Sequence, residues 1–455
     1  MIAECANTKK RSALAFIGTA VSCIMFIIEH NRIYTNTIPI ILLSFIYILF
    51  YIHTFYKENK IVLLNNFYQL YFMIGILLSA AVVSAGADMI EVGAFGDANG
   101  SFWIILAFFF AGIEATCLGF RSNIFIFFGE KSPNQSKQEA SIIILPIVFT
   151  VILLGFFIFF TSGSPILLGV DRVTFWRTIV PENFSFFPSL VIQTYFFLSY
   201  YFLYMKMKGE KIFIPSIIII SYIFITIMIL GEKFSAFILA ISAWMTIISG
   251  TFPSFKINSK QLLYISIISL LIISLISVNY AISGRDSSFI FSRIALQSQL
   301  MWSLSSDQYG LSMLPSSDWS CFWQCGYFDS GSDYISHRYL PNNVYSFYYD
   351  NGTNLSGFTP ALPMLTFGFF IAYILNILAC LSLGAIQKSI HISIKRENFI
   401  TSFLLYKVQL GIAIAWFGAI HSAIIGSVFA LIFSIVYIFI FGVNNKKAKD
   451  AVRFS

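Results

Sequence analysis

The chain has 455 residues, of which 58% are hydrophobic and 11% are charged, and its mean hydropathy is +0.80. Roughly a quarter of the residues of a soluble globular domain are charged, so this composition excludes a soluble fold and indicates an integral membrane protein. The net charge of +7 does not indicate nucleic acid, because in a membrane protein the distribution of Lys and Arg between the two sides matters more than their sum.

Apolar runs of about 20 residues, the length that crosses a bilayer as a helix, recur along the whole chain. They predict an all-α membrane protein with about twelve spans, forming a single polytopic domain over residues 1–455. The first run follows Lys9, Lys10 and Arg11 without a small-residue cleavage site, which indicates an uncleaved first span. The expected spans are residues 12–29, 38–55, 62–84, 101–120, 141–161, 188–205, 212–230, 235–252, 261–282, 361–385, 398–417 and 422–441.

Most of the 28 Lys and Arg residues fall at the two termini and in every second loop between these spans. The positive-inside rule assigns that side to the cytoplasm, so both termini are expected to be cytoplasmic.

Residues 283–360 are the longest polar stretch and lie between the ninth and tenth expected spans, on the outer side. Their many Trp and Tyr residues can bury surface, so we expect a small folded cap rather than a disordered loop. Cys321 and Cys325 lie in this cap and could form a local disulfide or stay reduced.

Aromatic side chains interleaved with Asp, Asn, Gln and Arg are what carbohydrate recognition needs, because sugars offer apolar ring faces and many hydroxyls. The same aromatic residues could instead form an ordinary interfacial belt. The candidate sugar-binding residues are Gln297, Trp302, Arg338, Asn342 and Asn343 of the large loop, with Arg172 and Arg177 of the outer loop at residues 162–187.

Arg285 and Arg293 follow the ninth expected span, where a planar, permanently charged guanidinium could stabilise a diphosphate leaving group. Lys233, in the short outer turn GEKFSAF, could be a further phosphate contact. The alternative is that the arginines snorkel to the interface and that Lys233 merely ends a helix.

His337 is the histidine of the large loop and a candidate general base for a sugar hydroxyl, with Asp307, Asp318, Asp329 and Asp333 as rivals. Glu114 is an intramembrane acid, which is by default functional or paired. It is a further candidate for substrate binding, and Lys407 could instead be its partner. We find no phosphate-loop or zinc-hydrolase signature in the sequence.

With its expected spans, inward termini, large outer loop and flanking arginines, the chain resembles the Wzy-type O-antigen polymerases. GEKFSAF resembles the basic span junction of these polymerases and the related ligases, and RIALQSQLMW, NNVYSF and GFTPALP resemble their large-loop pattern.

The resemblance implies a GT-C-like membrane glycosyltransferase of lipopolysaccharide biosynthesis in the bacterial inner membrane, with a periplasmic site and no cofactor or metal. Such an enzyme transfers a growing glycan from undecaprenyl diphosphate onto a new lipid-linked repeat unit, and a chain-length regulator protein could act with it. Arg285, Arg293 and Lys233 would then hold the diphosphate. Two alternatives stay open, an O-antigen ligase and, from a different class, a lipid-linked oligosaccharide flippase.

Overall fold

The computed structural model describes residues 2–30, 37–84, 88–89, 94–95, 101–130, 137–170, 172–207, 209, 213–231, 235–251, 319–322, 331–350, 361–417 and 422–442. The chain divides into two compact units. Unit 1 comprises Met1–Phe128, Ile290–Ser389 and Leu404–Val436, and unit 2 comprises Gly129–Phe289, Ile390–Phe403 and Tyr437–Ser455.

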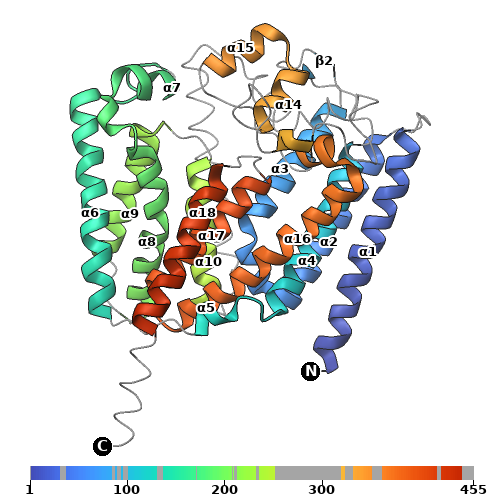
Figure 1. Ribbon diagram of the computed structural model, residues 1–455, viewed down its shortest axis with the longest axis horizontal. Helices are drawn as coiled ribbons and strands as arrows, with labels where there is room; N and C mark the ends of the chain where they lie inside the picture. The colour runs from blue at the N-terminus through green and yellow to red at the C-terminus, as the bar shows by residue number, and fades with distance from the viewer. Residues whose placement is uncertain are drawn as a thin grey trace, which may run out of the picture. The chain divides into compact units, whose positions relative to one another are not determined.

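Helices make up nearly all of the described chain (Figure 1). In chain order the α-helices are α1 (Ile2–His30), α2 (Thr37–Asn65), α3 (Phe67–Ser84), α4 (Ser101–Arg121), α5 (Ile126–Glu130), α6 (Lys137–Ser162), α7 (Arg172–Thr174), α8 (Phe187–Met207), α9 (Phe213–Phe224), α10 (Ser235–Thr251), α14 (Gly331–Tyr339), α15 (Asn342–Asp350), α16 (Ala361–Lys395), α17 (Phe399–Phe417) and α18 (Ser422–Tyr437). Short π or 3-10 turns are η1 (Phe175–Ile179), η2 (Glu182–Phe184), η3 (Ile225–Ile229), η5 (Trp319–Phe322) and η6 (Ile438–Gly442). Strands β1 (Asp88–Met89) and β2 (Ala94–Phe95) form one small antiparallel pair.

Eight of the described helices are long and apolar enough to cross a membrane, and three shorter apolar helices accompany them. They coincide with the expected spans, except that residues 261–282 lie outside the described residues. Large apolar side chains point outward from these helices, as at Phe16, Phe160 and Phe213, which are 75%, 81% and 72% exposed. Such surfaces are stable against hydrocarbon rather than water. The expectation of a multi-pass, helical membrane protein is therefore confirmed.

Two helices extend beyond their expected spans. α2 continues through the expected loop to Asn65, with one non-helical residue at Asn59. α16 has 35 residues and continues to Lys395, although the apolar run predicted an end near residue 385. At about 1.5 Å per residue α16 is longer than a bilayer's hydrocarbon core of about 30 Å, so part of it must lie outside that core. Gly368, with φ 74°, marks a break near its start, in a backbone conformation that a residue with a Cβ rarely adopts.

Helix α4 is the central helix of unit 1, because 83% of its apolar window is buried. Its aromatic residues, including Phe108, Phe109 and Phe110, lie in the hydrophobic core with residues of α1, α2, α3 and α16. α4 and α16 approach each other closely at two glycines. A Cβ added at Gly119 would overlap the carbonyl oxygen of Leu381, and one added at Gly384 would overlap the carbonyl oxygen of Thr116.

Unit 2 is built on α6, α8, α9 and α10, with hydroxyl contacts between the apolar helices. Tyr222 donates a hydrogen bond to Thr194 Oγ1 at 3.0 Å, and the hydroxyls of Tyr195 and Thr226 lie 2.6 Å apart. Because hydrocarbon offers no partner to a hydroxyl, these internal bonds let α8 and α9 carry polar residues within apolar spans.

Candidate functional site

The described part of the large loop contains a helical hairpin, α14 followed by α15. Pro341 separates the two helices, and because proline has no N–H it cannot extend α14. Its carbonyl accepts bonds from the backbone N–H of Val344 and Tyr345, both at 2.9 Å, which starts α15. Figure 1 shows α14 and α15 lying beyond one end of the unit 1 helices.

One face of the hairpin packs on the rest of unit 1. Asp333, Ile335 and Leu340 are at most 6% exposed, and Ile335 belongs to the hydrophobic core that also contains residues of α16. Phe322 of η5 adds a ring 5.0 Å from that of Phe367 in α16. The hairpin is therefore anchored to the first turns of α16.

The opposite face carries exposed polar residues interleaved with aromatic rings. We call it the hairpin surface, consisting of His337, Arg338, Asn342, Asn343, Tyr345 and Tyr349. The ring of His337 meets that of Tyr345 edge to face at 4.9 Å, and Tyr345 lies 5.8 Å from Tyr349 at an interplanar angle of 30°. Arg338 donates a long hydrogen bond of 3.5 Å to the Tyr334 hydroxyl. Four of the residues that the sequence predicted for the site, His337, Arg338, Asn342 and Asn343, are thus exposed on this hairpin.

Two other predicted residues, Arg172 and Arg177, belong to unit 2 and are exposed. They lie on α7 and η1, a segment that Trp176 anchors by stacking on Phe187, with centroids 6.1 Å apart and an interplanar angle of 22°. A Cβ added at Gly231 would lie 3.2 Å from Cβ of Arg172. Arg172 therefore lies against Gly231, the first residue of the GEKFSAF turn.

Several predicted residues lie outside the described residues. These are Lys233, Arg285, Arg293, Gln297, Trp302, Asp307, Asp318, Asp329 and Cys325.

Glu114 lies apart from the hairpin surface, in an ion-pair cluster. Its two carboxylate oxygens accept hydrogen bonds from Arg11 Nε at 2.7 Å and Nη2 at 2.9 Å, and Tyr51 donates a further bond at 2.8 Å. Glu58 lies 3.6 Å from Arg11 Nη1, and Arg11 stacks over Phe55 at 5.2 Å. The expected partner Lys407 is thus replaced by Arg11, a residue that sequence analysis counted as a cytoplasmic flanking charge.

A second buried polar group went unrecognised in the sequence. We call it the amide row, consisting of Asn65, Asn66, Gln69, Gln387 and Gln409, all at most 6% exposed. Asn65 and Asn66 stand where α2 ends and α3 begins. Gln409 of α17 donates to the Asn65 carbonyl at 3.0 Å, and Gln387 of α16 donates to Asn66 Oδ1 at 2.9 Å. Two helices thus supply donors to the break between two others.

The amide row also contains acceptors without donors. The Oε1 atoms of Gln69, Gln387 and Gln409 have no hydrogen-bond partner in the described part of the chain. Nearby, Gln69 Nε2, Cys380 Sγ and Asn376 Nδ2 all lie within 3.4 Å of where a Cβ of Gly112 would be. The only sign of this row in the sequence is that Asn and Gln residues occur within apolar runs. Which of these amides lie together is not predictable until the helices are packed against one another.

Comparison with known proteins gives one match. Residues 328–416 match the model of a family of unknown function (DUF6418). No curated protein and no solved structure matches the chain. The matched segment contains the hairpin surface, α16 and nearly all of α17, and therefore includes Gln387 and Gln409 of the amide row. The chain is thus similar to DUF6418 over the hairpin and the two long helices that follow it.

Proposed function

We propose that the protein is a polysaccharide polymerase, a membrane glycosyltransferase of the Wzy type. In this reaction an acceptor sugar hydroxyl attacks the anomeric carbon of the lipid-linked donor. The bond from that carbon to the diphosphate oxygen breaks, the diphosphate leaves with the bonding electrons, and a base takes the hydroxyl proton. The product is a glycan that is one repeat unit longer, with undecaprenyl diphosphate released.

The observation that carries this proposal is the hairpin surface. The imidazole of His337 contacts the ring of Tyr345, and Arg338, Asn342 and Asn343 are exposed on the same hairpin, which lies at one end of the unit 1 helices. Tyrosine faces can stack on sugar rings, and amide and guanidinium groups can bind sugar hydroxyls. This set of groups matches an oligosaccharide better than an apolar solute.

The same structure favours one general base over a described rival. His337 is exposed on the hairpin surface. Asp333 is 5% exposed and lies on the face of the hairpin that packs against the rest of unit 1. A base must reach the hydroxyl from which it takes the proton, so the role goes to His337. Arg285, Arg293 and Lys233 would bind the diphosphate, because cations stabilise the charge that develops on the leaving group. Arg172 and Arg177 would be further substrate contacts.

Glu114 has no part in the proposed reaction. Its carboxylate already accepts hydrogen bonds from Arg11 and Tyr51. Because the carboxylate oxygens already accept these bonds, Glu114 is better suited to joining α4 to α1 and α2 than to binding a substrate.

The test is deletion of the gene in the native host, followed by separation of the surface glycan on a denaturing gel. A polymerase defect leaves a single repeat unit on the lipid core in place of the ladder, and the wild-type gene on a plasmid restores the ladder. Loss of every substituted band with accumulation of undecaprenyl-linked chains would show a ligase instead. Repeat units trapped on the inner leaflet would show a flippase.

A further inference from the structure

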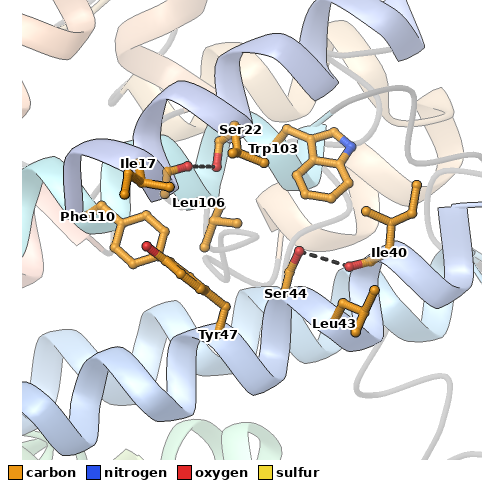
Figure 2. A pocket seen from close by; sticks show the side chains of 11 residues that line it. Ile17, Ser22, Ile40, Leu43, Ser44, Tyr47, Trp103, Leu106 and Phe110 are labelled. Atoms are coloured by element: carbon orange, nitrogen blue, oxygen red, sulfur yellow. Dashed lines mark hydrogen bonds between the residues drawn. The ribbon is translucent and has the colours of Figure 1, made fainter. Parts of the chain in front are cut away.

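An apolar pocket of about 230 Å³ lies between α1, α2 and α4 of unit 1 (Figure 2). Trp103 and Ile40 lie at one end of it, and Tyr47 and Phe110 lie at the other. Trp103 and Phe110 are at most 1% exposed and form its floor. Trp103 and Phe110 are seven positions apart, which corresponds to a length of about 10 Å along α4.

The pocket exists because small side chains stand where α1 and α2 face each other. Gly18 has no side chain, and a Cβ there would lie 2.5 Å from the ring of Phe110. Ser22 and Ser44 contribute single hydroxyls, and each donates to a carbonyl of its own helix, at 2.7 Å and 2.9 Å. Because these hydroxyls are already bonded, the pocket presents an apolar wall.

The rim of the pocket is open to the surroundings of the helices. Ile17, Val21 and Leu43 are 50%, 48% and 64% exposed, and all three belong to helices that are long and apolar enough to cross a membrane. Hydrocarbon therefore surrounds the opening, and no water is available to fill a pocket with this lining.

The ring of Trp103 closes one end of the pocket, while its indole Nε1 is buried away from the opening. Trp103 is the third residue of α4, near a helix end, and tryptophan is enriched at the level of lipid head groups.

We infer that this pocket binds one acyl chain of a glycerophospholipid. At about 30 Å³ per small group, close to the volume of one liquid water, the pocket holds about eight methylenes, which matches its length. No Lys or Arg lines the pocket, so nothing there would neutralise a diphosphate. This favours a phospholipid over a polyprenyl diphosphate, and the site is independent of the proposed reaction.

The test is native mass spectrometry of the full-length protein, purified in a mild detergent, with the retained lipids identified after extraction. The wild-type protein should retain one phospholipid per chain. Ser44→Phe, which places a ring in the pocket, should lose it. The matched control is Ile46→Phe, because Ile46 is 64% exposed on the same helix but does not line the pocket.

The inference is wrong if Ser44→Phe retains the phospholipid as the wild type does, if the wild type retains none, or if the retained lipid is a polyprenyl diphosphate. Should Ser44→Phe fail to fold, the wild-type protein in bilayers with brominated acyl chains gives the answer. Bromine quenches the fluorescence of a nearby indole. The tryptophan fluorescence of the wild-type protein should therefore be quenched more strongly than that of the Trp103→Phe variant. Equal quenching in the two proteins would also overturn the inference.

Discussion

Arg11 and Glu114 join α1 to α4 through two hydrogen bonds between charged groups, with side chains that are 2% and 18% exposed. A bidentate pair of this kind is strong, but its main consequence appears when one partner is removed, because the other charge stays buried. Ser12 of α1 adds an exposed 3.2 Å contact with the same carboxylate, and the apolar contacts between the two helices leave their relative register less well defined. The pair therefore sets how α1 sits against α4.

We predict that Glu114→Leu lowers the free energy of unfolding by about 3 kcal/mol, because Arg11 keeps a buried charge without its main partner. Unfolding of the purified protein in mixed micelles measures this. Arg11→Leu combined with Glu114→Leu should cost less than the sum of the two single changes. Ser12→Ala is the control, since its hydroxyl makes an exposed 3.2 Å contact with the same carboxylate and should cost little.

His337 carries the proposed proton transfer, so its replacement should affect the reaction and not the fold. His337→Gln is expected to slow glycan extension by about 10²-fold or more, the usual contribution of a general base. Extension of a lipid-linked repeat unit in reconstituted membranes measures the rate. Ser346→Ala, an exposed change on α15, should leave the rate unaltered. Normal extension by His337→Gln would remove the histidine from the mechanism.

At the scale of elements, α4 and α16 pack with their backbones in contact. Gly119 on α4 and Gly384 on α16 each face a carbonyl of the other helix, with no room for a Cβ. Small residues at such positions let membrane helices approach closely, because dispersion contacts replace the hydrophobic effect that drives packing in water. This approach also carries Asn376 to its 3.1 Å bond with the Phe108 carbonyl.

Gly384→Ala should destabilise the protein by about 3 kcal/mol, because the added methyl group forces the helices apart. The matched control is Gly426→Ala on α18, where an added Cβ meets nothing within 4 Å and the better helix former should cost nothing. Both variants can be compared by their melting temperatures in the same detergent. Equal melting temperatures would contradict the close packing.

The break between α2 and α3 depends on amides from other helices. Gln409→Met removes the donor to the Asn65 carbonyl while keeping a similar side-chain volume, and we expect a loss of about 1–3 kcal/mol. Gln193→Met is the comparison, because Gln193 is exposed and bonds to Ser189 of its own helix. If the two variants unfold alike, the amide row adds nothing to stability.

At the scale of the whole molecule, the expected topology makes a direct prediction about the two ends of α16. The hairpin surface precedes this helix, and the exposed turn at Arg396 follows it. Because α16 is longer than the hydrocarbon core, these two sites should face opposite compartments.

With the native cysteines replaced by serine, Ser346→Cys should react with a membrane-impermeant maleimide added to spheroplasts. Arg396→Cys should react only after the membrane is permeabilised, because the positive-inside rule assigns that end to the cytoplasm. Reaction of both sites from the outside would refute the predicted orientation. A reversed pattern would place the termini outside.

The sequence by itself determined the class of this protein, because apolar runs of membrane-spanning length are a local property that needs no knowledge of partners. It also predicted that His337, Arg338, Asn342 and Asn343 belong to one region, since they lie close together in the chain. Helix ends at Asn65 and Lys395 escaped prediction, because polar residues can continue a helix beyond the apolar run.

Only the tertiary structure decided which distant residues meet. Arg11 rather than Lys407 pairs with Glu114, and Gln409 rather than water pairs with the Asn65 carbonyl. Hydropathy records how polar each residue is but not the face of the helix on which it lies relative to its neighbours. Pairing depends on that face and on how closely the helices pack, and in α4 and α16 the packing rests on two glycines that carry no polar signal at all.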